Sequence, residues 1–98
     1  MTGEAILLLK RRQYRSEDSF IELSVYELPD PLNGSIHRYK YRLAYVVSGV
    51  YLMRYDNEDG KGDHRHIGTA EVSYDFRDLA TLLRDFFADV ERMEGGRP

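Results

Sequence analysis

The stretch Asp56–His66 combines residue types that could act on a phosphate group. It holds two of the chain's three histidines, an arginine between them, and a lysine flanked by two glycines. Histidine changes its charge near neutral pH, and side chains of an extended segment alternate sides, so His64 and His66 share one face while Arg65 points to the other. A glycine-rich turn can also offer backbone N–H groups to an anion. The pattern fits a phosphate-handling site as well as it fits a solvated β-hairpin loop with incidental histidines.

Metal-free RNA cleavage is one interpretation of the histidine pair. One imidazole would take the proton of the 2′-hydroxyl, and the other would protonate the leaving 5′-oxygen. Lys61, Arg65 or Arg42 would stabilise the charge that builds on the phosphoryl oxygens. The ordinary histidine pKa, about 6.5, suits both proton transfers. Rings two residues apart along a strand lie roughly 7 Å from each other, a distance that can bracket a phosphate.

Two other interpretations stay open. His64 and His66 could ligate a divalent metal with Asp63 or Asp56, although no further glutamate or histidine at a suitable spacing completes the ligand set. The stretch could also bind nucleic-acid phosphate without cleaving it. Nucleotide hydrolysis has little support, because Gly60–Gly62 lacks the spacing and the following Ser or Thr of a P-loop. Acyl transfer has little support either, because no serine or cysteine stands beside the histidines.

The clearest predicted strand, His37–Val47, places cations next to this stretch. Its tyrosines share one face with Leu43 and Val47, and Arg38, Lys40 and Arg42 share the other. Ser48-Gly49 indicates a two-residue turn before a returning strand, residues 50–55. The expected opposed pairs are Val46 with Tyr51, Ala44 with Met53, Arg42 with Tyr55, and Lys40 with Asn57. This register predicts a cationic, aromatic patch beside the histidines; the alternative is a solvated face whose charges prevent edge-to-edge aggregation.

The remaining elements predict an α+β domain. Residues 5–9 read as a short buried strand that ends in a solvated basic run, residues 10–12, and residues 20–28 alternate as a half-buried strand. A fifth short strand could follow at residues 67–72. A helix capped by Asp75 or Ser73 and ended by Gly95-Gly96 comes last. Its expected apolar stripe is Phe76, Leu79, Leu83, Phe86, Phe87, Val90 and Met93, and its expected solvated side carries Asp85, Asp89, Glu91 and Arg92. The fold class is therefore a curled antiparallel β-sheet of four to five strands with one C-terminal helix packed on one face.

Composition indicates one soluble domain over residues 1–98. The chain is 42% hydrophobic and 32% charged, and it has no cysteine, which excludes disulfides and cysteine-ligated zinc. No apolar run reaches the roughly 20 residues that span a bilayer, and no signal peptide is evident, so a cytoplasmic location is expected. The net charge of −3 argues against a generally cationic surface. The charge is uneven, since residues 37–68 hold six Lys or Arg against four Asp or Glu.

Three blocks of sequence resemble the TumE family of prokaryotic toxin–antitoxin toxins. They are His37-Arg38-Tyr39-Lys40-Tyr41-Arg42-Leu43-Ala44-Tyr45-Val46, then Arg54-Tyr55-Asp56-Asn57, then Gly60-Lys61-Gly62-Asp63-His64-Arg65-His66-Ile67-Gly68. The likeness extends from the first strand to the terminal helix. It implies a toxin whose cognate antitoxin is a helix-turn-helix protein encoded beside it, and it leaves the mechanism open.

The sequence therefore predicts a toxin that acts on RNA as a metal-independent endoribonuclease. The expected catalytic residues are His64 and His66 as the acid/base pair, Asp63 to orient a histidine, and Lys61 and Arg65 to bind phosphate. The expected RNA-binding residues are Arg38, Lys40, Arg42, Arg54, Tyr55 and Asn57, with Tyr55 able to stack on a base. No metal or cofactor is expected, and self-association is left open. The alternatives are a non-catalytic inhibitor that binds nucleic acid or protein, a metal-dependent nuclease, and an inert antitoxin-like partner.

Overall fold

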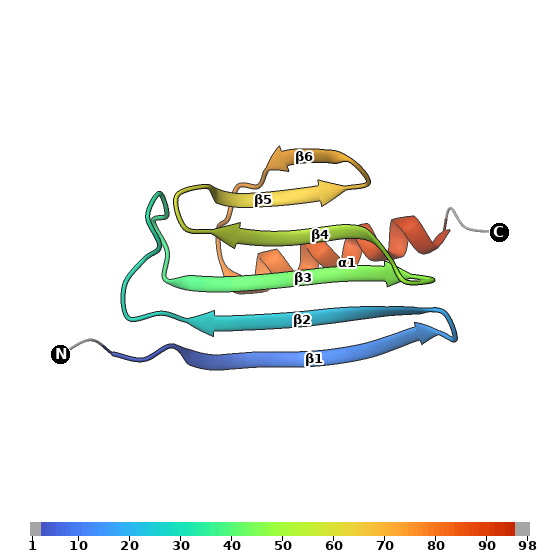
Figure 1. The fold of residues 1–98 in the computed structure, drawn as a ribbon, viewed down its shortest axis with the longest axis horizontal. Coiled ribbons are helices and arrows are strands. Elements are labelled where there is room, and N and C mark those ends of the chain that lie inside the picture. The colour runs from blue at the N-terminus through green and yellow to red at the C-terminus, as the bar shows by residue number, and fades with distance from the viewer. Residues whose placement is uncertain (1–2, 96–98) are drawn as a thin grey trace.

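The computed structural model describes residues 3–95, which form a sheet of six antiparallel strands with a helix on one face (Figure 1). The elements are β1 (Ile6–Ser16), β2 (Ser19–Glu27), β3 (Tyr39–Val47), β4 (Val50–Glu58), β5 (Gly62–Ile67), β6 (Ala70–Ser73) and α1 (Leu79–Gly95). Each strand pairs with the next one along the chain. The α+β prediction is confirmed, but the sheet has six strands rather than four or five, and it is not curled. Among the described residues, no helix has the length and apolar character needed to cross a bilayer.

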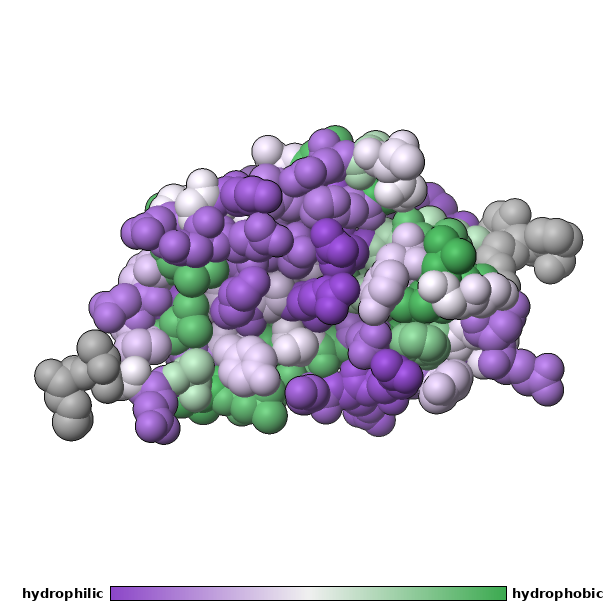
Figure 2. All heavy atoms as spheres, in the orientation of Figure 1, coloured by the Kyte–Doolittle hydropathy of each residue, from purple (hydrophilic) through white to green (hydrophobic). Residues whose placement is uncertain are grey.

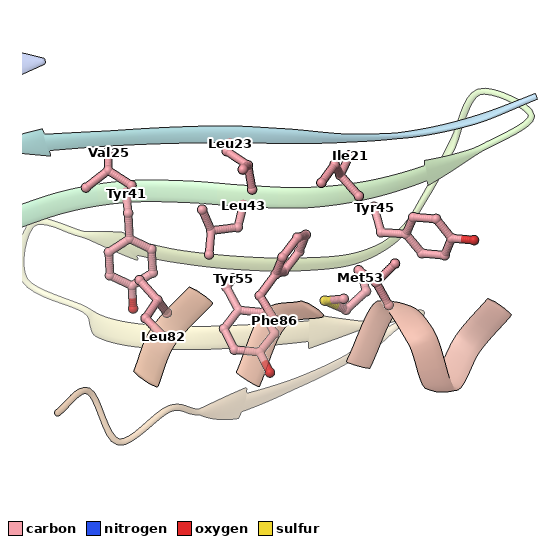
Figure 3. Close-up of a cluster of buried hydrophobic side chains, with 11 residues drawn as sticks. Ile21, Leu23, Val25, Tyr41, Leu43, Tyr45, Met53, Tyr55, Leu82 and Phe86 are labelled. Atoms are coloured by element: carbon pink, nitrogen blue, oxygen red, sulfur yellow. The ribbon is translucent and has the colours of Figure 1, made fainter. Parts of the chain in front are cut away.

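The two faces of the sheet differ in character. The face opposite α1, called the open face below, is hydrophilic over most of its area (Figure 2). The face toward α1 holds the core (Figure 3), which comprises Ile21, Leu23, Val25, Tyr41, Leu43, Tyr45, Met53, Tyr55, Leu82, Phe86 and Val90. The alternation predicted for β2 and β3 is confirmed by this division. Leu82 is fully buried although it was not in the predicted stripe, and Phe76 precedes the helix and stacks on His37 with ring centroids 3.9 Å apart.

A β-bulge decides which β4 residues reach each face. The predicted turn and the Val46–Tyr51 pair are confirmed, but Tyr45 then pairs with Met53, which leaves Leu52 as an extra residue. The pairs predicted beyond this point are wrong by one residue, because Arg42 lies opposite Asp56 rather than Tyr55. A one-residue shift exchanges the faces of a strand. The bulge thereby buries Met53 and Tyr55 and keeps the Arg54 guanidinium out of the core.

The stretch Asp56–His66, expected as a loop, is a continuous β-hairpin. It comprises the end of β4, a tight turn at residues 59–61, and β5. Gly60 and Gly62 adopt φ angles of +82° and +76°, a left-handed conformation that glycine reaches without strain. The turn is also tied to the loop before β3, since Gly60 N–H donates to the Asn33 carbonyl over 2.8 Å. That N–H is therefore occupied rather than free for an anion.

The first strand is longer and more exposed than its apolar start suggested. The exposed fractions of Ile6, Leu7 and Leu8 are 58%, 51% and 46%. The prediction of a buried strand is wrong because β1 lies at the edge of the sheet, pairs only with β2, and extends beyond the area that α1 covers.

Asp78, rather than Asp75 or Ser73, caps the helix. Its carboxylate accepts a hydrogen bond from Thr81 N–H over 2.7 Å, which satisfies one of the free donors of the first turn. This backbone hydrogen bond, followed by one from the Thr81 side chain, lowers the pKa of Asp78. The helix ends at Gly95, and Gly96 lies outside the described residues.

We expect the cap to make stability depend on acid pH. The folded state favours the Asp78 carboxylate, so its contribution is complete above the ordinary Asp pKa of about 3.9 and is lost as the pH falls through the lower folded pKa. Asp78→Asn keeps a capping side chain that does not titrate in this range. The thermal midpoint of the variant should therefore fall less steeply between about pH 5 and pH 2 than that of the parent protein. Equal slopes would contradict this assignment.

Candidate functional site

Two rows of directly paired residues cross the open face from β1 to β6. The first, the Asp56 row, runs Lys10, Ser24, Arg42, Asp56, His64, Ser73. The second, the Arg54 row, runs Arg12, Glu22, Ala44, Arg54, His66, Glu71. Directly paired residues of neighbouring strands point to the same face of a sheet. The rows therefore place both histidines among charged side chains on one surface.

His64 and His66 form the centre of the site. Their ring centroids lie 6.3 Å apart, and both side chains are partly exposed, at 17% and 27%. The alternation of β5 thus places the two rings on one face, as predicted. His66 Nε2 lies 3.4 Å from Asp56 Oδ1 and 4.0 Å from Glu71 Oε1, and His64 Nδ1 lies 3.3 Å from the same Glu71 oxygen. Glu71 thus reaches toward both rings.

Glu71 is a site residue that the sequence pattern did not predict. It lies on β6, whose pairing with β5 sets it directly opposite His66. The signal was the Gly68-Thr69 turn, which makes a hairpin of two short strands rather than one strand through residues 67–72. A carboxylate beside an imidazole can fix its ring orientation and tautomer, and Asp56 and Glu71 are the carboxylates in position to do so.

The two nitrogens of His64 have different surroundings. Nδ1 faces Glu71, whose side chain is 51% exposed, whereas Nε2 is buried and has no hydrogen-bond partner among the described residues. Proton transfer by His64 would therefore use Nδ1, with Glu71 moving aside or taking part.

The predicted cations of β3, β4 and the residue before β3 have different partners. Arg54 pairs with Asp56, with Nε 2.9 Å from Oδ2, and Arg42 is exposed with its guanidinium 5.3 Å from the Tyr51 ring. Lys40 donates to the Asn57 carbonyl, and Arg38 lies 3.7 Å from Glu27. Arg42 and Arg54 thus stand nearest the histidines in the two rows.

A shallow cleft of about 330 Å³ continues the site toward β1. It is lined by Lys10, Arg11, Arg12, Glu22, Leu23, Ser24, Arg42 and Ala44. Arg42 belongs both to the cleft and to the Asp56 row, two strands or about 10 Å from His64. The basic run of β1, expected as a solvated strand end, therefore forms one wall of a cationic cleft.

Several predicted site residues point away from the histidines. Asp63 is on the helix side, where it contacts His37 Nε2 at 2.9 Å and accepts a hydrogen bond from the Tyr41 hydroxyl over 2.6 Å. Burial, followed by this hydrogen bond, raises the pKa of Tyr41, so the hydroxyl stays protonated as the donor. Arg65 faces α1 and lies 3.4 Å from Asp89, and exposed Lys61 lies 3.5 Å from Glu58.

Two predicted RNA-binding residues belong to the interior. Tyr55 is 1% exposed and donates a hydrogen bond to Asp89, so its ring faces the core rather than a base. The Asn57 amide is also 1% exposed; its oxygen accepts from Tyr41 N–H over 2.9 Å and its nitrogen donates to the Tyr39 carbonyl over 2.7 Å. Asn57 thus closes the β3–β4 ladder where the strands separate.

We expect Asn57→Ala to lower the free energy of unfolding by about 2 kcal/mol, because the variant leaves the buried Tyr41 N–H and the partly buried Tyr39 carbonyl without their partners. Urea denaturation followed by circular dichroism measures the change. Asn33→Ala is the matched control, since it removes an exposed amide that bonds exposed Asp59, and it should cost less than about 0.5 kcal/mol. Equal losses in the two variants would contradict a structural role for Asn57.

The titratable and charged side chains of the site determine which reactions it can perform. Within the described part of the chain, no three or more His, Asp or Glu side chains are arranged so that they could hold a metal ion. The two imidazoles, two carboxylates and two guanidiniums of the site can transfer protons and bind an anion.

Comparison with known proteins gives the chain a family. The family model described as toxin TumE matches residues 5–94. No curated protein and no solved structure matches the chain. The match spans most of the chain, and the blocks that resemble the family include both histidines and Arg54. The protein belongs to the TumE toxin family.

Proposed function

We propose that this TumE-family toxin acts on RNA as a metal-independent endoribonuclease, with His64 and His66 as its acid/base pair. The observation that carries the proposal is the pair of imidazoles 6.3 Å apart on the open face, beside Asp56 and Glu71. Rings at this separation can reach two oxygens of one phosphodiester, either directly or through one water.

The proposed reaction is an internal transesterification. One imidazole removes the 2′-hydroxyl proton, the 2′-oxygen attacks phosphorus, and the other imidazole protonates the departing 5′-oxygen. The products are a 2′,3′-cyclic phosphate and a free 5′-hydroxyl. Arg54, directly opposite His66, is the cation best placed to stabilise charge on the phosphoryl oxygens.

The cleft between β1 and β3 supports RNA as the substrate class. Lys10, Arg12 and Arg42 line it, and Arg42 lies in the Asp56 row, two strands from His64. We propose that the RNA backbone lies along the two rows, with flanking phosphates in the cleft and the reacting phosphate at β5. Contacts of this kind weaken as salt displaces them.

The testing experiment incubates the purified protein with RNA, with and without EDTA, and analyses the ends of the products. We expect cleavage in both tubes and 2′,3′-cyclic phosphate ends. Cleavage that EDTA abolishes would assign the histidines to metal-dependent chemistry. Intact RNA in both tubes would contradict the endoribonuclease proposal.

A non-catalytic inhibitor that binds RNA is the second candidate. It is favoured by the position of the cleft, which lies two strands from the histidines and could hold phosphates without them. Such a protein would protect RNA stoichiometrically and would show no turnover, so the end analysis separates the two functions.

Membership of a toxin family implies a cognate antitoxin. We propose that this antitoxin is a helix-turn-helix protein encoded beside the toxin.

A further inference from the structure

We propose that the outer edge of β1 is the docking strand for the cognate antitoxin, which adds an acidic, extended segment there as a seventh strand. The proposal rests on family membership and on the geometry of β1, and it does not depend on RNA cleavage.

The two edges of the sheet are unequal. β6 has four residues, whereas β1 has eleven, about twice the usual strand length. An edge strand presents unpaired N–H and C=O groups that another chain can join, and short edge strands limit this. The long edge of this protein is therefore the one that can accept a strand.

The start of β1 also exposes apolar side chains. Ile6, Leu7 and Leu8 are consecutive and about half exposed. A strand paired along this edge would cover part of them, and burial of apolar area would stabilise the complex.

The charges of β1 favour an acidic partner. The strand holds Lys10, Arg11, Arg12 and Arg15 and no acidic residue. Arg12 pairs with Glu22 and Arg15 with Glu94, whereas Lys10 and Arg11 have no carboxylate partner in the described range 3–95. The positive charges of Lys10 and Arg11 can therefore pair with carboxylates of a partner protein.

The same charges disfavour a second copy of this chain. A symmetric antiparallel pairing of two complete β1 strands is centred on Arg11 and sets Lys10 against Arg12. Like charges directly opposite each other destabilise a strand pair. The positive charges of β1 would attract an acidic segment, whereas they would repel a second copy of β1.

Docking of the antitoxin at this edge would also explain how the antitoxin inhibits the toxin. Lys10 and Arg12 line the cleft beside β1, so carboxylates placed there would neutralise its wall and compete with phosphate. If the RNA proposal fails, the docking prediction still stands on its own.

Residue-resolved amide exchange of the ¹⁵N-labelled toxin, free and bound to the cognate antitoxin, tests the proposal. We expect the outward-facing β1 amides to exchange at least about tenfold more slowly in the complex, as amides of a paired strand do. Unchanged β1 exchange with protection elsewhere would overturn the proposal. Protection of β1 in a toxin homodimer without antitoxin would assign the edge to a second copy and overturn it as well.

A charge-reversal pair tests the chemistry of the partner. We expect Lys10→Glu with Arg11→Glu to weaken antitoxin binding at least about tenfold at low salt, because two attractive contacts become repulsive. The matched control is Arg77→Glu with Arg84→Glu, which reverses two exposed charges beside the start of α1 and should change the Kd less than about twofold. Equal affinities of the two double variants would exclude an acidic partner at β1. Circular dichroism confirms that both variants fold.

Discussion

Replacing either His64 or His66 with alanine is expected to lower the rate of RNA cleavage by about 10² to 10⁴-fold, the usual contribution of a positioned acid or base. Each ring is partly exposed on the open face and is absent from the core cluster, so the fold should tolerate both changes. The measurement is single-turnover cleavage of a labelled RNA by each variant. Full activity in both variants would overturn the acid/base assignment.

The third histidine is the matched control for this experiment. His37 is on the helix side of the sheet, where it contacts Asp63 and stacks on Phe76. His37→Gln removes an imidazole without touching the open face, so cleavage should change less than about threefold below the melting temperature of the variant. A loss as large as that of the β5 variants would move the catalytic centre to the other face.

Asp89→Ala is expected to be the most destabilising polar substitution, with a loss of about 3 to 4 kcal/mol. The Asp89 carboxylate is 3% exposed and accepts from the Tyr55 hydroxyl, and it pairs with Arg65 and Arg92. Its removal leaves a phenol and the Arg65 guanidinium without their acceptor under the helix. The loss is a large part of the about 5 to 15 kcal/mol that stabilises a typical domain.

Glu91→Ala is the control for Asp89, because it removes an exposed carboxylate from the same helix. It should change the free energy of unfolding by less than about 0.5 kcal/mol. Chemical denaturation of both variants measures the difference, and similar small losses would show that Asp89 behaves as a solvated residue. Helical periodicity predicted Asp89 on the solvated side of the helix; this prediction is wrong, because the residue is buried against the sheet.

The burial of Asp89 shows that helical periodicity alone does not identify every buried residue of a helix. The pattern of apolar residues identified the covered face of α1, but a carboxylate can join this face when the sheet supplies donors. Tyr55 and Arg65 are those donors, and they come from β4 and β5. Nothing in the helix sequence alone indicates that they meet Asp89.

Strand alternation predicted more of the fold than strand pairing did. Residues of β2 and β3 alternate so clearly that their faces could be assigned from sequence. In β4, Leu52 and Met53 are both apolar, so either could face the core, and the bulge is settled by packing against β3. The exposure of β1 likewise depends on its place at the edge of the sheet, which local sequence does not specify.

The candidate site was predicted in part. The shared face of His64 and His66 followed from alternation alone. Asp56 and Glu71 approach the rings only through the bulged register of β4 and the pairing of β6. The same alternation sets Arg65 on the opposite side of β5 from the histidines, as predicted. It also sets Asp63 on that side, away from the two rings, although Asp63 was expected among the catalytic residues.

The order of the elements along the chain has a consequence for synthesis. Every strand pairs with its immediate predecessor, so each hairpin can close soon after its second strand leaves the ribosome. The helix that covers the core follows all six strands. The growing sheet therefore exposes its apolar face until α1 is made, and during this interval chaperones or a bound antitoxin can shield the nascent toxin.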